Sequence, residues 1–69
     1  MMEVRFVLRD CDTYATIYHR DNGKPVGTIF RGRIYSKEPA FTVRKDGETI
    51  GTAETRGELR KLVHGTNWD

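Results

Sequence analysis

The sequence predicts a small α+β domain, in which an antiparallel sheet of four to five strands in hairpins carries one C-terminal helix on one face. Three observations predict this fold class: short segments alternate apolar and polar residues, turn sequences separate them, and one segment near the end has helical periodicity. The 69 residues suffice for a single domain, 1–69. A core drawn from 36% hydrophobic residues is small, so a homo-oligomer is a further expectation.

Five strands are expected before the helix. They cover Glu3–Arg9, Tyr14–His19 and Val26–Tyr35, followed by a hairpin over residues 41–53 whose turn is Asp46-Gly47. Asp10-Cys11-Asp12, Asp21-Asn22-Gly23 and the loop Ser36–Pro39 separate the first strands. Both sides of Tyr14–His19 carry large side chains, so either can face the core.

The helix is predicted from its caps and its apolar spacing. Thr55 and Glu58 form a capping box, and Leu59, Leu62 and Val63 share one face. Gly65 is expected to end the helix. Residues 20–29 also align with residues 44–53 at four identical positions, which fits either a duplicated hairpin or ordinary turn chemistry.

Strand alternation assigns residues to the two faces of the sheet. Expected on the buried face are Val4, Phe6, Leu8, Val26, Phe30, Phe41, Val43 and Ile50, packed against the apolar face of the helix. Trp68 is expected to fold back over this layer, because an exposed tryptophan leaves much apolar area in water.

The same alternation places five arginines together on the opposite, helix-free face: Arg5, Arg9, Arg31, Arg33 and Arg44. Lys45 flanks them, and Tyr14 or Tyr18 offers a stacking surface. Arginine binds phosphate and carboxylate in bidentate fashion, so this face fits nucleic acid or an acidic protein surface. The alternative is a solvated face, on which arginine stems only cover the strands. A register shift that separated the arginines would remove the basis of the functional interpretation.

Residues 50–59 resemble sheet-plus-helix DNA-binding proteins, namely plant AP2 domains and the arm-type domains of phage integrases. In those proteins a strand ending near Gly-Thr leads into a threonine-capped helix. The matching residues here are Gly51, Thr52 and Thr55. The resemblance implies an architecture in which the open sheet face enters the major groove of DNA.

Motifs for catalysis, metals or cofactors are not found in the sequence. Cys11 and Ser36 are the only thiol and serine hydroxyl, and Cys11 is expected in a turn or at an edge. His19 and His64 lack metal-ligand spacing, and His64 suits the end of a helix. Asp10 and Asp12 alone are a weak cation pattern. We therefore expect no enzyme activity, no cofactor and no metal.

The remaining interpretation is a non-enzymatic binding module with nucleic acid as its anionic partner, contacted mainly by Arg31, Arg33 and Arg44. The alternatives are a phage-type accessory protein that binds and inhibits or modulates a host protein, and a self-assembling structural protein. The single cysteine favours a reducing compartment, the cytoplasm, or the host cytoplasm if the gene is viral. The N-terminal residues form no long apolar run, so neither a signal peptide nor a membrane span is expected.

Overall fold

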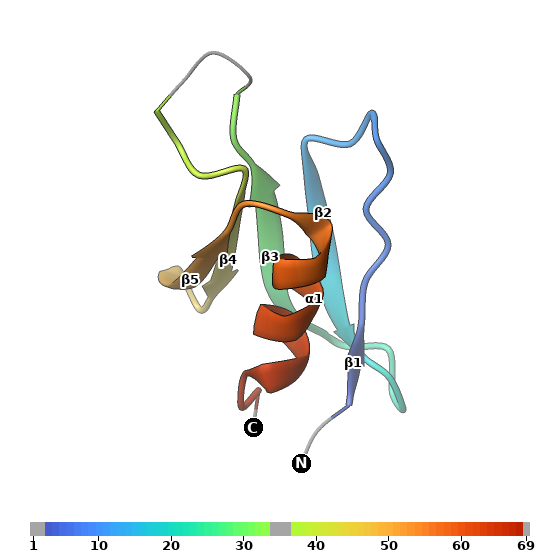
Figure 1. Cartoon of the computed structure of the whole chain (residues 1–69). Coiled ribbons are helices and arrows are strands. Elements are labelled where there is room, and N and C mark those ends of the chain that lie inside the picture. Colours follow the sequence, from blue (N-terminus) through green and yellow to red (C-terminus); the bar gives the residue numbers. More distant parts are fainter. Residues whose placement is uncertain (1–2, 34–36, 69) are drawn as a thin grey trace.

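A computed structural model describes residues 3–33 and 37–68, and it confirms the predicted fold class. The elements are β1 (Val4–Arg5), β2 (Tyr14–His19), β3 (Pro25–Arg31), β4 (Phe41–Lys45), β5 (Glu48–Ala53) and α1 (Arg56–Gly65). All neighbouring strands are antiparallel, and their spatial order follows the chain. Helix α1 lies against one face of this sheet (Figure 1), and the other face is open.

The core forms between the sheet and α1. Its buried residues are Val4, Leu8, Ala15, Ile17, Ile29, Phe41, Val43, Ala53, Leu59, Val63 and Trp68. The expected burial of Val4, Leu8, Phe41, Val43 and Trp68 is therefore confirmed. Phe6, Val26 and Leu62 are partly buried against this cluster. For β2, the sheet turns Ala15 and Ile17 inward and leaves Tyr14 and Tyr18 exposed.

Two residues expected in the core are exposed instead. Phe30 is 43% exposed, because its neighbour Ile29 occupies the inner face between Ala15 and Val43. Ile50 is 36% exposed, at a register shift between β4 and β5. The predicted inward and outward positions of β3 are thus wrong by one residue, and the side chains predicted for one face lie on the other.

Two inward-facing glycines explain this exchange. A Cβ on Gly27 would lie 2.6 Å from Cζ3 of Trp68, and one on Gly51 would lie 2.8 Å from Cδ1 of Leu62. Trp68 and Leu62 therefore approach the sheet at positions that carry no side chain. Gly27 and Gly51 are equivalent positions in the aligned segments 20–29 and 44–53.

The predicted turn and helix cap are present with small differences. Asp46 and Gly47 both have positive φ, of 53° and 81°, as a tight hairpin turn requires. Thr55 Oγ1 accepts a hydrogen bond from Glu58 N at 3.1 Å. Glu58 Oε2 accepts from Glu54 N at 2.9 Å, one residue before the cap itself. These bonds start α1 at Arg56.

The end of α1 differs from the expectation. Gly65 is the last helical residue, and it does not adopt the positive φ of a glycine cap. Thr66 ends the helix instead, with extended φ and ψ. Its Oγ1 donates a hydrogen bond to Leu62 O at 2.6 Å. The chain then returns to the sheet, and Trp68 Nε1 donates to Val63 O at 2.8 Å.

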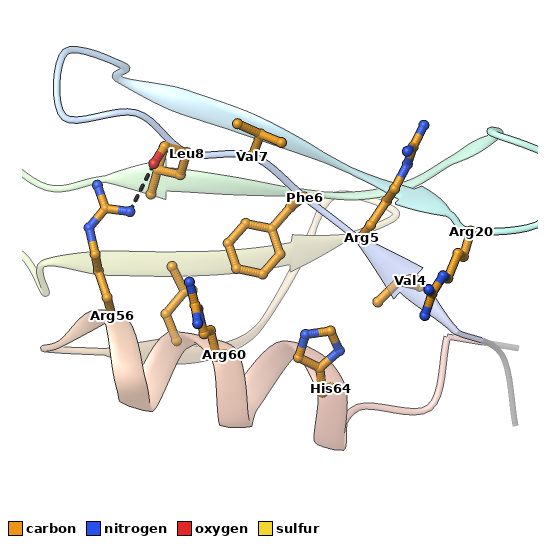
Figure 2. A pocket seen from close by; sticks show the side chains of 10 residues that line it. Val4, Arg5, Phe6, Val7, Leu8, Arg20, Arg56, Arg60 and His64 are labelled. Atoms are coloured by element: carbon orange, nitrogen blue, oxygen red, sulfur yellow. Dashed lines mark hydrogen bonds between the residues drawn. The ribbon is translucent and has the colours of Figure 1, made fainter.

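The first strand is much shorter than the predicted Glu3–Arg9, since only Val4 and Arg5 pair with β2. Figure 2 shows Phe6 pointing toward α1, while Arg5 and Val7 point away from it. Beyond Arg5, main-chain carbonyls accept hydrogen bonds from arginine side chains instead of from β2. Strand β3 also ends early, at Arg31, and the predicted strand residues Ile34 and Tyr35 lie outside the described residues.

Among the described residues, no helix is long and apolar enough to cross a membrane.

The packing of Trp68 on Gly27 predicts opposite effects for two glycine substitutions. Gly27→Ala should lower the free energy of unfolding by about 1–3 kcal/mol, because the new methyl group overlaps the indole ring. Gly65→Ala should raise it by about 0.5 kcal/mol, because no atom lies within 4 Å of the added Cβ. Urea unfolding followed by circular dichroism measures both. Equal effects of the two substitutions would contradict this packing.

Candidate binding face

The open face of the sheet is built from the alternate residues of every strand. Tyr14 lies directly opposite Phe30, and Tyr18 lies opposite Arg5. Arg44 lies opposite Thr28, which in turn pairs with Thr16. Thr42 and Thr52 continue the face across β4 and β5. These outward strand positions hold aromatic rings, threonines and two arginines, with no carboxylate among those described.

The seven residues predicted to bind the partner do not share this face. The expected row of five arginines on the open face, the arginine stripe, is therefore not formed. Arg5, Arg44 and Tyr18 lie on the open face. Arg31 and Lys45 each lie two residues after an inward-facing residue, Ile29 or Val43, which places them on the helix side. Arg9 and Arg33 follow the ends of β1 and β3, outside the sheet ladder.

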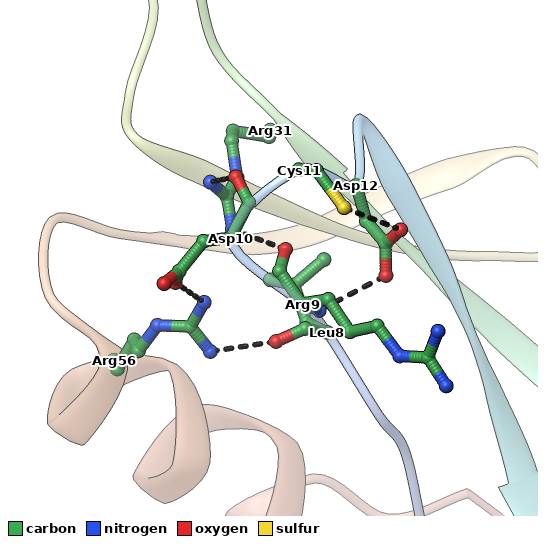
Figure 3. Close-up of polar contacts among 7 residues, drawn as sticks. All are labelled: Leu8, Arg9, Asp10, Cys11, Asp12, Arg31 and Arg56. Carbon is green, nitrogen blue, oxygen red and sulfur yellow. Dashed lines mark hydrogen bonds and ion pairs between the residues drawn. The ribbon is translucent and has the colours of Figure 1, made fainter.

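Arg31 has a structural role (Figure 3). Its guanidinium donates hydrogen bonds to Asp10 O at 2.8 Å and to Arg9 O at 3.2 Å. The same group lies 5.6 Å from the centre of the Phe41 ring, at cation–π distance. Arg56 completes the arrangement, because it donates to Leu8 O at 2.8 Å and to Asp10 Oδ1 at 2.9 Å. The two arginines thus hold the chain after β1 in place.

Lys45 is on the helix side because Val43, two residues earlier, faces the core. Its Nζ donates a hydrogen bond to Asn67 O at 3.3 Å, which ties the end of β4 to the C-terminal segment. Arg44, between them, points to the open face and donates to Gly47 O in the adjacent turn. The register of β4 therefore leaves one of these two predicted basic residues available to a partner.

Phe30 is the open-face residue that sequence alternation missed. Its ring lies between two hollows of the open face, one of about 480 Å³ beside Thr28 and one of about 240 Å³ beside Thr42. Arg44 lines both hollows, and each also has a carboxylate in its lining, Asp46 in the larger one and Glu38 in the smaller one. An aromatic ring between two hollows that share one guanidinium can contact a planar group and its attached anion together. The inward glycine Gly27 was the available sequence signal.

Cys11 and the two histidines lie in ordinary surroundings, and Ser36 lies outside the described residues. Cys11 is exposed, with Sγ 4.0 Å from Asp12 Oδ1. His19 Nδ1 accepts a hydrogen bond from Asp21 N at 3.1 Å, and the His64 ring centre lies 6.4 Å from that of Phe6. Within the described ranges, no group of three or more His, Cys, Asp or Glu side chains is arranged to hold a metal ion.

Comparison of the chain with protein-family models, with curated proteins and with solved structures gives no match.

The different positions of Arg31 and Arg44 predict different effects on stability. Arg31→Met should lower the free energy of unfolding by about 1–2 kcal/mol, because two hydrogen bonds to loop carbonyls and the contact with Phe41 are lost. Arg44→Met, the matched control on the open face, should change it by less than about 0.5 kcal/mol. Urea unfolding of both variants is the measurement. A loss of stability in Arg44→Met but not in Arg31→Met would contradict the assignment of Arg31 to the helix side and Arg44 to the open face.

Proposed function

We propose that the protein is a non-enzymatic module that binds single-stranded nucleic acid on the open face of its sheet. The observation that carries this proposal is the exposed cross-strand pair of Tyr14, 60% exposed, and Phe30, 43% exposed. Aromatic rings on an open sheet stack with unpaired bases, and each such contact stabilises binding by about 1–3 kcal/mol. Tyr18, 40% exposed, extends the aromatic surface along β2.

The charges of the face support a single strand more than a duplex. Arg5 and Arg44 flank the aromatic residues, and each can contact a phosphate. Binding to a duplex draws on many phosphate contacts, and the arginines that would have provided them lie elsewhere. Threonine hydroxyls at Thr16, Thr28 and Thr42 can donate to and accept from base edges. Binding would therefore depend on bases stacked on aromatic rings and on two phosphate contacts, and not on the predicted arginine stripe.

A cytoplasmic location is part of the proposal. Cys11 is a free and exposed thiol, which a reducing compartment preserves. Nucleic acid in single-stranded form is also available there.

Removal of the stacking rings tests the proposal. Fluorescence anisotropy with a labelled oligothymidylate of about 12 nucleotides should show binding at about 50 mM salt, at least tenfold tighter than to a duplex of equal length. Tyr14→Ala and Phe30→Ala should each weaken binding about tenfold, whereas Tyr14→Phe, which keeps the ring, should leave it nearly unchanged. Absence of binding, or equal losses for Tyr14→Ala and Tyr14→Phe, would contradict the proposal.

The salt dependence tests the number of cations involved. With phosphate contacts from Arg5 and Arg44 only, the slope of log K against log salt concentration should be about −1.4, or about −0.7 for each contact with a single strand. Arg44→Met should reduce that slope by about half, and Arg31→Met should not change it. A slope of about −3.5, expected for five arginines, would show that the phosphates are bound by another set of side chains.

A further inference from the structure

A groove lies between α1 and the segment Val4–Leu8, lined by different elements from the aromatic pair of the open face (Figure 2). Its volume is about 470 Å³. Phe6 and Leu59 give it an apolar floor, and Arg60 and His64 extend from successive turns of α1 toward the segment. The groove thus combines apolar contact area with a basic wall.

The charged side chains described along the groove are all basic. Arg20 and Arg56 line it, but each already has a carboxylate partner, Glu3 at 3.3 Å and Asp10 at 2.9 Å. The Arg60 side chain forms no hydrogen bond or ion pair with another described residue. Among residues 3–33 and 37–68, no aspartate or glutamate lines the groove. An anionic group entering it would therefore meet an unpaired guanidinium beside apolar side chains.

The main chain beside the groove is an open sheet edge. Arg20 N, one residue past β2, donates to Glu3 O at 2.9 Å, so the peptide groups of Glu3 face the β2 side. In an antiparallel ladder such positions alternate, so the peptide groups of Arg5 face β2 and those of Val4 and Phe6 face away. β1 is the outermost strand, and Phe6 makes no main-chain hydrogen bond with another described residue. This edge can pair with a further strand.

We infer that this groove binds an extended acidic peptide segment of a partner protein, which pairs with the outer edge of β1. Main-chain bonds at Val4 and Phe6 would hold the segment, and its alternate side chains would then lie over α1. An acidic side chain there reaches Arg60, and an apolar one reaches Phe6. The free edge and apolar floor favour a peptide, since nucleic acid has no main-chain amides to pair with them. Edge-to-edge pairing of β1 with a second copy would bring like charges, including Arg5, together, which disfavours it.

The charge of the partner is tested with two labelled peptides of about eight residues. One alternates glutamate and valine, and the other alternates lysine and valine. In fluorescence anisotropy with the full chain, the acidic peptide should bind at least tenfold tighter than the basic one. Arg60→Glu should weaken the acidic peptide at least tenfold. Lys61→Glu is the matched control, because it makes the same charge change on α1 outside the groove and should alter affinity less than threefold.

Strand pairing is tested without changing the protein. N-methylation of alternate amides of the acidic peptide, in each of the two possible sets, should abolish binding for one set and spare the other. The inference would be overturned if all peptides bound with equal affinity, or if Arg60→Glu and Lys61→Glu had equal effects. It would also be overturned if the peptide still bound with either set of amides methylated. Displacement of the peptide by oligothymidylate, or a chain dimer in sedimentation that excludes the peptide, would also overturn it.

Discussion

The contact between Trp68 and Gly27 determines which face of the central strand is buried. The indole ring lies where a Cβ would stand, and its Nε1 donates to Val63 O, so the chain end is fixed to both the sheet and α1. Because side chains alternate along a strand, an inward Gly27 puts Ile29 in the core and Phe30 outside. One close approach between ring and main chain therefore sets the orientation of all of β3.

Both proposed binding surfaces follow from that orientation. It turns Phe30 outward beside Tyr14, which creates the aromatic centre of the open face. It also turns Arg31 inward, where the guanidinium binds carbonyls of the chain after β1. Those bonds, with the ones from Arg56, draw that chain toward α1 and away from the ladder. The unpaired edge and the basic groove result from this departure.

Much of the fold was predictable from local signals, whereas the composition of the candidate site was not. The turn at Asp46-Gly47 and the cap at Thr55 depend on neighbouring residues, and both are present. The face of β3 depends on Trp68, about forty positions away, and on two glycines that alternation treats as neutral. A shift of one residue exchanges the two faces of a strand. The prediction therefore assigned both Arg31 and Phe30 to the wrong face.

The orientation of β3 is tested most directly by proton–proton nuclear Overhauser effects in solution. We predict that the Phe30 ring shows contacts with the Tyr14 ring and none with Leu59 or Val63, because it lies on the open face. Contacts from the Phe30 ring to those methyl groups of α1 would contradict the orientation of β3.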